Sequence, residues 1–340
     1  MGYRRKKQQV ERRIRIVKRI LGCMVAVLIV AVCAFSAFYP PKTWKYYLNM
    51  PNLGERSYGE ARIHFLDVGQ GDSILMELPD GKVALIDGGN GSQDAANAVL
   101  RHLNGLHIDT IDYLVVTHAD ADHCGSLDLV LEYKTVLNAY LPAISVEEVG
   151  AEYAEFYAAL LKEEGCARQY SSRSVSLSNT GGQFPYTLQF LYPYTIDAEE
   201  EDLEENVKKD SNSLSSVLWF DYKGISALFA GDAPTDTEEK LVWADEKGFL
   251  QPYGVDLRST EILKVAHHGS NASTSLAFLQ YLRAKTAVIS CGRNNSYGHP
   301  SDRVMQNLEA VGAAAYRTDE LGTVVVSIQP SGNYNVLIPS

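Results

Sequence analysis

Residues 117–126 read THADADHCGS and follow directly on the apolar run IDYLVV at 111–116. Four side chains of metal-binding type lie within this stretch: His118, Asp120, Asp122 and His123. A strand that opens into a loop turns alternate side chains toward one point, and a helix beginning near Cys124 would direct the positive end of its dipole there. A polar surface loop is the alternative interpretation, but two His and two Asp directly after an apolar strand favour a metal site.

Two distant segments carry the same kind of signal. Asp232 follows the strand-like run ISALFA in GDA at 231–233, and His267 and His268 follow EILKVA in HHGS at 267–270. An Asp after Gly on its own is usually a turn, because its side chain bonds its own backbone. Three strand ends that each bear metal-competent side chains predict a common rim. Imidazole and carboxylate ligands suit Zn, Mn or Fe.

The body of the chain mixes short apolar strands with helical periodicity. Strands are predicted at 61–69, 72–78, 82–89, 111–117, 186–193, 216–224, 225–233, 261–266, 286–291 and 323–329. Helices are predicted at 94–106, 146–164, 235–247, 274–283 and 301–311. The acidic residues 196–210 are predicted to form a solvated loop. The first strands follow one another directly along the chain, and the later strands alternate with helices. This order predicts one α/β domain with two sheets and helices outside.

The first 60 residues have a different composition. Residues 1–19 carry nine Lys/Arg and one acid and precede the uncharged run ILGCMVAVLIVAVCAFSAFY at 20–39. A helix of this length spans about 30 Å, the thickness of one hydrocarbon core. The positive-inside rule predicts a cytoplasmic tip at 1–19, a single-pass transmembrane anchor at 20–39, and a linker at 40–59 before an extracellular domain at 60–340. Two alternatives are a signal peptide cleaved after Ala34-Phe35-Ser36 and a buried core helix.

Charge and cysteine content exclude some classes. The formal net charge is −11; the tip accounts for +8, which leaves −19 on the remainder. An acidic body speaks against broad electrostatic adhesion to nucleic acid. The five cysteines are too few for a disulfide scaffold in a chain of 340 residues.

Residues 61–329 resemble the metallo-β-lactamase-fold hydrolases, and more specifically the hydrolase domain of ComEC-type competence proteins and its stand-alone relatives. HADADH at 118–123 is similar to the signature H-x-[HD]-x-D-H with Asp at the second position. Seven further blocks support the resemblance: FLDVGQGDS (65–73), LIDGG (85–89), NSLSSVLWF (212–220), LFAGD (228–232), VAHHGS (265–270), YGHP (297–300) and YRTDELG (316–322). The resemblance implies a four-layer αβ/βα sandwich with the site at one edge, between the sheets.

The resemblance also implies residue roles. His118 and Asp120 match the pair that binds one of two divalent metal ions, Zn or Mn. Asp122 and His123 match the pair for the other, and Asp232 matches the carboxylate that bridges both. His268 matches the terminal histidine ligand, with His267 facing the substrate or supporting the ligands, although the two could exchange roles.

Four further residues are candidates around these ligands. Asp87 matches an aspartate that holds a ligand loop by hydrogen bonds. Asp72, Ser215 and His299 lie in ComEC-like blocks and are candidates near the substrate. The predicted catalytic residues are Asp122, His267 and His299.

The chain departs from the superfamily in the middle of the fold. A histidine usually found before the GD strand has no clear match, and Tyr192 stands where it is expected. The metal held by His118 and Asp120 therefore lacks one protein ligand. Completion by Asp72, by water or by substrate stays open, as does occupancy by one metal only.

These features predict a membrane-anchored metal-dependent hydrolase, a phosphodiesterase or nuclease that uses a metal-activated hydroxide. Nucleic acid or nucleotide and a cell-wall or lipid phosphodiester such as a phosphocholine ester are both open as substrates. Lys264, Arg258 and Arg293 are the cations available to a phosphate. The alternatives are hydrolysis of an ester, lactam or lactone and a non-catalytic metal-binding surface module, and no protein partner can be inferred.

Overall fold

A computed structural model describes the chain except residues 1, 39–40, 49, 147–148, 195–209 and 340. The acidic segment predicted as a loop at 196–210 therefore lies, apart from Asp210, outside the described residues. The chain divides into two compact units, Met1–Asn49 and Met50–Ser340. Each unit is described by itself.

The N-terminal unit is built around the helix α1 (Gly2–Phe38). The helix begins within the basic residues, well before the predicted start at residue 20. Its segment Glu11–Ala37 is long and apolar enough to cross a membrane, and none of its most apolar window is buried. This exposure contradicts the interpretation as a buried core helix. The predicted linker also contains regular structure, since η1 (Pro41–Tyr46) is a 3-10 helix.

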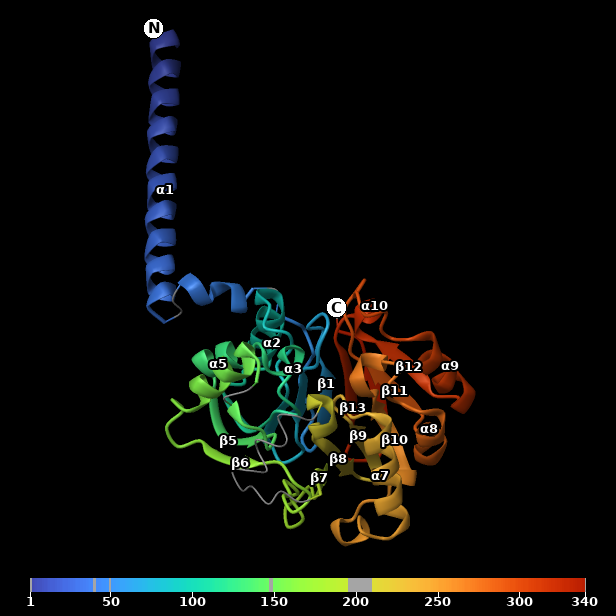
Figure 1. Ribbon diagram of the computed structural model, residues 1–340. Coiled ribbons are helices and arrows are strands. Elements are labelled where there is room, and N and C mark those ends of the chain that lie inside the picture. The colour runs from blue at the N-terminus through green and yellow to red at the C-terminus, as the bar shows by residue number, and fades with distance from the viewer. Residues whose placement is uncertain (1, 39–40, 49, 147–148, 195–209, 340) are drawn as a thin grey trace. The chain divides into compact units, whose positions relative to one another are not determined.

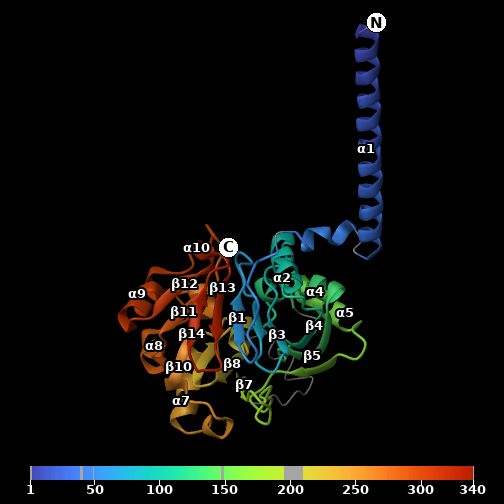
Figure 2. The same cartoon turned by 180° about the vertical axis from the view of Figure 1, so that it is seen from behind.

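The second unit contains two sheets (Figures 1 and 2). The first has the order β14-β13-β1-β2-β3-β4-β5-β6, and the second has the order β12-β11-β10-β9-β8-β7. The strands of the first sheet are β1 (Ala61–Phe65), β2 (Ile74–Glu77), β3 (Val83–Ile86), β4 (Thr110–Val115), β5 (Thr135–Leu141), β6 (Ala167–Tyr170), β13 (Val324–Ile328) and β14 (Tyr334–Leu337). Those of the second are β7 (Thr187–Tyr192), β8 (Val217–Tyr222), β9 (Ile225–Phe229), β10 (Thr260–Lys264), β11 (Thr286–Ile289) and β12 (Ala314–Arg317).

The core lies between the inner faces of the two sheets. Phe65 and Ile86 of the first sheet belong to one buried cluster with Phe190, Phe220 and Phe229 of the second. These side chains alternate along their strands with residues that face the outer layers, as a two-layer sheet packing requires.

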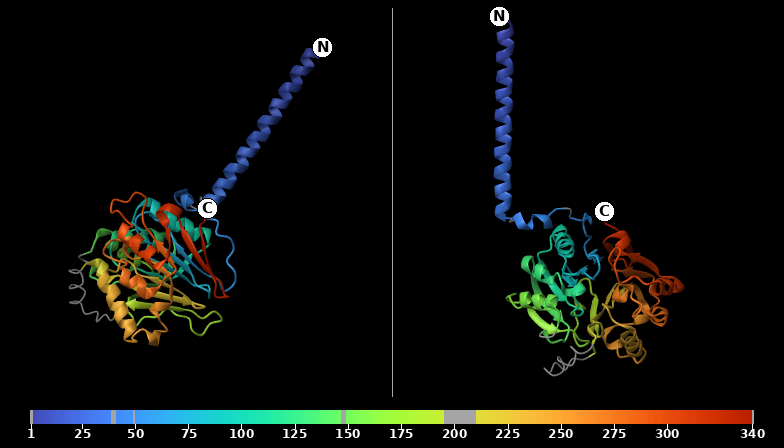
Figure 3. Two further views of the ribbon diagram at one scale, coloured as in Figure 1. Left: turned by 90° about the vertical axis from the view of Figure 1, so that its right-hand side faces the viewer. Right: turned by 45° about the horizontal axis from the view of Figure 1, so that its top comes forward.

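Helices cover the outer faces (Figures 1 and 3). They are α2 (Gln93–Gly105), α3 (Ala121–Cys124), α4 (Leu127–Tyr133), α5 (Ala151–Leu160), α7 (Thr235–Glu246), α8 (Leu276–Leu282), α9 (Asp302–Val311) and α10 (Thr318–Leu321). Leu241 of α7, Phe278 of α8 and Leu308 of α9 pack with Trp219 and Leu263 from the outer face of the second sheet. The predicted αβ/βα sandwich is confirmed.

The parallel strands of both sheets direct their carboxyl ends to the predicted site. In the first sheet β3, β4, β5 and β6 are parallel, and in the second β9, β10, β11 and β12 are parallel. Asp87 follows β3, the HADADH segment follows β4, Asp232 follows β9 and His268 follows β10. Parallel strands place such residues along one edge of a sheet.

Some predicted elements differ from the structure. The helix predicted to begin near Cys124 is wrong in position, because α3 ends at Cys124 and α4 begins only at Leu127. The helix predicted at 146–164 is shorter, Ala151–Leu160. Four strands, β5, β6, β12 and β14, were not predicted from the sequence. In β6 and β12 the residues are exposed or half-buried, so their sequences lack an apolar strand pattern.

The loop before β2 packs against the backbone of the HADADH segment. Asp72 N donates to the Asp122 carbonyl oxygen at 3.1 Å. After β3, Gly88 N donates to the His123 carbonyl oxygen at 2.6 Å. Gly71 has φ +135°, and a Cβ atom there would lie 2.3 Å from the Asp122 carbonyl oxygen. Only glycine lets the two segments approach this closely.

We expect Gly71→Ala to displace the segment that carries Asp122 and His123, and so to lower both thermal stability and metal affinity. Gly81→Ala is the matched control, because Gly81 also has a positive φ (+93°) but nothing lies within 4 Å of a Cβ there. The control should pay only the backbone strain, about 1–3 kcal/mol. Thermal unfolding and Mn or Zn titration measure both effects. Equal metal affinity in the two variants would contradict this account of Gly71.

Candidate metal centre

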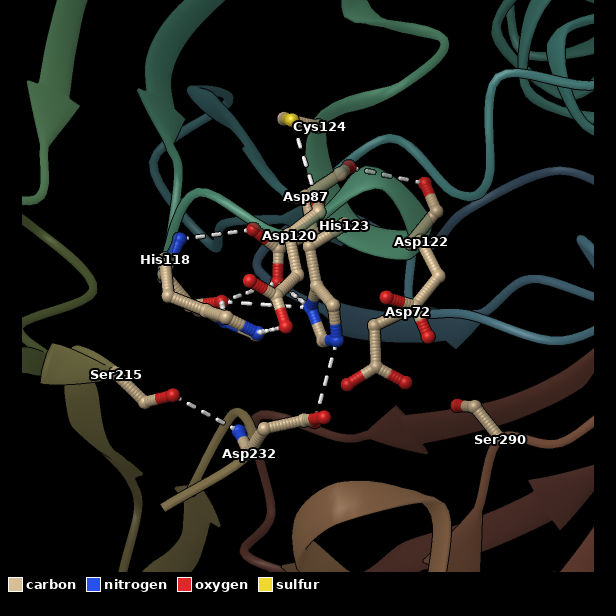
Figure 4. A network of polar contacts seen from close by, with 12 residues as sticks. Asp72, Asp87, His118, Asp120, Asp122, His123, Cys124, Ser215, Asp232 and Ser290 are labelled. Atoms are coloured by element: carbon tan, nitrogen blue, oxygen red, sulfur yellow. Dashed lines mark hydrogen bonds and ion pairs between the residues drawn. The ribbon is translucent and has the colours of Figure 1, made fainter. Parts of the chain in front are cut away.

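The HADADH segment places two imidazoles side by side. His118 and His123 are both fully buried, and their ring centroids are 4.0 Å apart. The acids of the segment reach outward: the side chain of Asp120 is 43% exposed and that of Asp122 is 31% exposed. The segment therefore provides a buried nitrogen pair flanked by carboxylates at the solvent side (Figure 4).

Asp87 fixes this segment from the end of β3. Its carboxylate accepts hydrogen bonds from the Thr117 amide at 2.8 Å, the Thr117 hydroxyl at 2.7 Å and His123 Nδ1 at 2.8 Å. Its backbone has φ 60°, a conformation sparsely populated by residues other than glycine. The hydrogen bonds lie where the predicted loop-holding role needs them, and they aim His123 Nε2 away from Asp87.

Asp232 approaches the same point from the second sheet. Its Oδ1 lies 3.2 Å from His123 Nε2, and its Oδ2 lies 3.6 Å from His268 Nε2. Ser215 holds it, because the Asp232 amide donates to the Ser215 hydroxyl at 3.1 Å. Figure 4 shows Asp232 and His123 facing one another across the gap between the sheets. Asp232 therefore lies between His123 and His268, where its carboxylate could help to hold a cation.

His268, rather than His267, has the geometry of a buried ligand. His268 Nδ1 donates to the Ser290 carbonyl oxygen at 2.9 Å, and Nε2 lies 3.3 Å from Asp122 Oδ2. His267 is 24% exposed in its side chain, and its Nε2 is 3.6 Å from Asp232 Oδ2. Both residues have positive φ, 50° and 52°. Backbone strain of this kind costs about 1–3 kcal/mol per residue and concentrates at functional sites.

The three buried imidazoles share one arrangement. The outer nitrogen of each is engaged: His123 Nδ1 by Asp87, His268 Nδ1 by Ser290, and His118 Nδ1 by the Thr117 hydroxyl at 3.0 Å. The inner Nε2 atoms of all three are buried without a hydrogen bond, as is Asp232 Oδ1. Buried polar atoms without partners are costly and rare. Their convergence fits a cation held by Nε2 lone pairs and carboxylate oxygens.

Overlapping sets of these atoms define where cations fit. Atoms of His118, His123 and Asp232 lie within 4.8 Å of one another, and so do atoms of Asp122, His123 and His268. Because the two sets share His123 and differ in their other members, the residues suit one ion or two neighbouring ions. Nitrogen and oxygen ligands suit Zn or Mn. Among the sets found in the described residues, none includes Asp120. Its Oδ2 is 3.7 Å from His118 Nε2.

The missing mid-fold histidine is not replaced by its neighbours in sequence. Tyr192 packs with the outer cluster of the second sheet, next to Tyr194 at 5.4 Å between ring centroids. Asp72 groups with Asp232 and His268, and its Oδ2 forms a 2.7 Å ion pair with Lys264. Among the described residues no set joins Asp72 to His118.

The cations predicted for phosphate binding are only partly available. Lys264 is fully buried and paired with Asp72, so it cannot contact a substrate. Arg258 lies in η5 (Leu257–Ser259) before the amino end of β10, at the opposite edge from His268, and stacks over Tyr281. Arg293 is exposed in the loop after β11. Sequence reasoning missed the Lys264–Asp72 pair, because nothing in the pattern KVAHH marks the lysine as buried.

The charges of the site shift its pKa values strongly. Burial lowers the pKa of His268, but the carboxylates of Asp232 and Asp72 outweigh it and raise the pKa to about 10. Burial also opposes the charge on His123, yet Asp232 and Asp87 hold its pKa well above the usual value. Burial and the charge of His123 lower the pKa of His118. Without a cation, protons on His123 and His268 balance the carboxylates.

The chain is similar to known proteins of one superfamily. Residues 66–293, more than half of the chain, match the family model described as the metallo-beta-lactamase superfamily. The chain belongs to this superfamily and has its metal-dependent hydrolase fold.

Particular relatives are competence proteins. ComE operon protein 3 of Bacillus subtilis is 30% identical over 78% of this chain and 33% of its own length. Competence protein ComA of Neisseria gonorrhoeae is 30% identical over 80% of this chain and 33% of its own length. Recombination protein 2 of Haemophilus influenzae is 28% identical over 78% of this chain and 29% of its own length. The chain thus spans about one third of the length of the curated relatives it matches.

Similar solved structures include Zn(2+)-bound PqqB from Methylobacterium extorquens, with a TM-score of 0.40 and 12% identity over 73% of this chain and 85% of that one. A diphosphatase from the PhnP family has a TM-score of 0.37 and 15% identity, over 67% of this chain and 85% of that one.

We expect metal affinity to rise with pH, because a metal must displace the protons of His268 and His123. The folded pKa of His268 is raised from 6.5 to about 10. The stability that its charge contributes is complete below pH 6.5 and is lost as pH rises through about 10. Unfolding temperatures of the chain alone should therefore fall over this range, while the increase on adding Mn or Zn should grow. An increase that stays equal between about pH 6 and pH 8 would count against proton displacement.

Proposed function

We propose that the chain is a metal-dependent phosphodiesterase. The observation that carries this proposal is the convergence of four buried atoms that have no hydrogen bond, at the gap between the sheets: His118 Nε2, His123 Nε2, Asp232 Oδ1 and His268 Nε2. A fold that holds no cation would have no reason to keep these atoms together, so their convergence supports metal-dependent chemistry.

Two divalent ions at such a site would lower the pKa of a bound water to about 7 and neutralise charge on an oxygen of the substrate. The chain's residues would act around them. Asp87, Thr117 and Ser290 hold the imidazoles with Nε2 inward. The predicted catalytic residues lie at the rim: Asp122 and His267 are partly exposed, and His299 is 5.7 Å from His267 between ring centroids.

His299 is suited to exchange a proton with the substrate. Burial and the charges of His268 and His267 lower its pKa, so its imidazole is neutral at neutral pH. Its Nδ1 is buried without a hydrogen bond. We assign it the role of orienting the substrate or, as a neutral base, of accepting a proton, next to the ligands but not among them.

A phosphodiester is favoured over an ester or lactam for two reasons. A phosphodiester carries a full negative charge, which divalent ions offset effectively. Relatives bear the names competence protein and recombination protein, which favour nucleic acid. A cell-wall or lipid phosphodiester, an ester or lactam, and a purely metal-binding role are the competing outcomes of the test.

Asp122→Ala and His123→Ala should abolish turnover of bis-(p-nitrophenyl) phosphate with Mn or Zn. Asp87→Asn should reduce it by about 10–100-fold, the usual cost of losing an outer-shell partner. Asp236→Ala, an exposed position in the first turn of α7, is the control and should keep full activity. The assay is run beside single-stranded DNA, a phosphocholine ester and a lactam. Full activity in either ligand variant, or turnover of the lactam alone, would refute the proposal.

We further propose that α1 anchors the protein in the cell membrane, with the basic end in the cytoplasm and the catalytic unit outside. The helix has the length and apolarity of a span, and its basic end is the one retained inside by the positive-inside rule.

Protease added to intact cells should remove the catalytic unit and leave a basic stub in the membrane fraction, detected by tags at each end. Protection of the catalytic unit in intact cells, followed by its digestion after permeabilisation, would show the opposite topology. A mature N-terminus at Ala37 would show that the segment is a cleaved signal peptide.

A further inference from the structure

Asp72 contacts three segments that carry or support predicted ligands. Its amide donates to the Asp122 carbonyl oxygen at 3.1 Å (Figure 4), and its carbonyl oxygen accepts from the Gly89 amide, two residues after Asp87, at 2.8 Å. Its carboxylate reaches the second sheet, where Oδ1 lies 3.4 Å from His268 Nδ1. One residue of the loop before β2 therefore joins the segments that follow β3, β4 and β10.

The Asp72 carboxylate lies beside the outer nitrogen of the His268 ring. His268 Nε2 faces the carboxylates of Asp122 at 3.3 Å and Asp232 at 3.6 Å, where a cation would be held. Asp72 approaches the other nitrogen, Nδ1, which donates to the Ser290 carbonyl oxygen at 2.9 Å. Carboxylates and carbonyl oxygens in this place orient a ligating imidazole and strengthen it as a ligand.

Lys264 holds the second oxygen of the same carboxylate. Its Nζ is 2.7 Å from Asp72 Oδ2 and donates to the Val265 carbonyl oxygen at 2.9 Å. The side chain of Lys264 is fully buried and that of Asp72 is 2% exposed. A buried ammonium is tolerated only with a charged partner, and without exposed surface it cannot contact a substrate. The ammonium therefore acts on Asp72, whose carboxylate it keeps in one orientation.

We infer that Lys264 and Asp72 form a positioning pair for the predicted ligand His268: Lys264 fixes the Asp72 carboxylate, and Asp72 keeps the imidazole with Nε2 toward the cation. This inference deepens the proposed function and rests on its metal centre. Both residues act through His268 and do not contact the substrate. A pair that only joined the two sheets would affect stability but not metal affinity, so the two roles have separate readouts.

The test separates metal affinity from stability with the double variant Asp72→Asn, Lys264→Met. Replacement of a buried ion pair by uncharged residues of similar volume often leaves stability unchanged. We therefore expect the variant without metal to unfold near the wild-type temperature. It should bind Mn about 10–100-fold more weakly, the usual cost of losing an outer-shell partner, with the wild-type stoichiometry.

Full-length protein in detergent micelles is titrated with Mn, and the electron paramagnetic resonance signal of free Mn gives the affinity and the stoichiometry. Circular dichroism gives the unfolding temperature. If the double variant does not fold, Asp72→Asn alone takes its place, because the amide oxygen can still accept a hydrogen bond from Lys264. The same loss of Mn affinity is expected.

The double variant Glu60→Gln, Arg62→Met is the matched control. Glu60 and Arg62 also form a buried ion pair, at 2.6 Å, with side chains 4% and 6% exposed. They lie at the amino end of β1, whereas the predicted ligands follow the carboxyl ends of the strands. The control should keep wild-type Mn affinity.

The outcomes separate the inference from the proposed function. Wild-type Mn affinity in the Asp72 variant, or an equal loss in the control, would overturn the positioning pair. Loss of one equivalent of Mn would make Asp72 a ligand itself and would overturn it as well. The expected loss of affinity in a protein whose wild type cleaves no phosphodiester would keep the pair and refute the enzyme.

Discussion

The structure depends on one constraint: three imidazoles are buried with their inner nitrogens facing one another and facing carboxylates. His118, His123 and His268 are each held from outside, so none can turn its Nε2 toward another partner. Unpaired polar atoms in a dry interior cost more than any single hydrogen bond returns. Protons can balance these charges and a metal can replace the protons, which links folding, pH and metal loading in one centre.

The two sheets are joined at this edge by ionic contacts as well as by the apolar core. Asp72 precedes β2 of the first sheet, and Lys264 ends β10 of the second; their 2.7 Å ion pair is fully buried. A buried pair of this kind adds little net stability over an apolar pair, but removal of one partner costs about 3–5 kcal/mol. The pair is thus one buried polar contact that links the two sheets at this edge. The contacts of Asp232 with His123 and of His268 with Asp122 link the same two sheets beside it.

The sequence predicted the site better than it predicted the periphery of the fold. HADADH, GDA and HHGS each follow an apolar strand, so their convergence could be inferred from chain pattern alone. Three kinds of feature could not. The strands β6 and β12 are short and partly exposed, and they pair because a neighbouring edge is present, not because of their own pattern. The burial of Lys264 depends on Asp72, which lies on the other sheet. The role of Gly71 depends on how closely the Asp122 carbonyl approaches it. All three depend on contacts between residues far apart in the chain, and a local sequence pattern does not predict such contacts.

The acidic character of the chain bears on substrate binding through the same centre. Asp72, Asp87, Asp120, Asp122 and Asp232 surround the gap, while the buried ammonium of Lys264 is committed to Asp72. Such a site attracts cations and repels a phosphodiester until divalent ions reverse its local charge. Charges on the distant surface are screened within about 8–10 Å at physiological salt, so the net charge of −19 outside the basic tip need not prevent contact at the rim. An anionic substrate would then be retained only by a loaded centre. In this arrangement selectivity for an anionic substrate would follow from the metal.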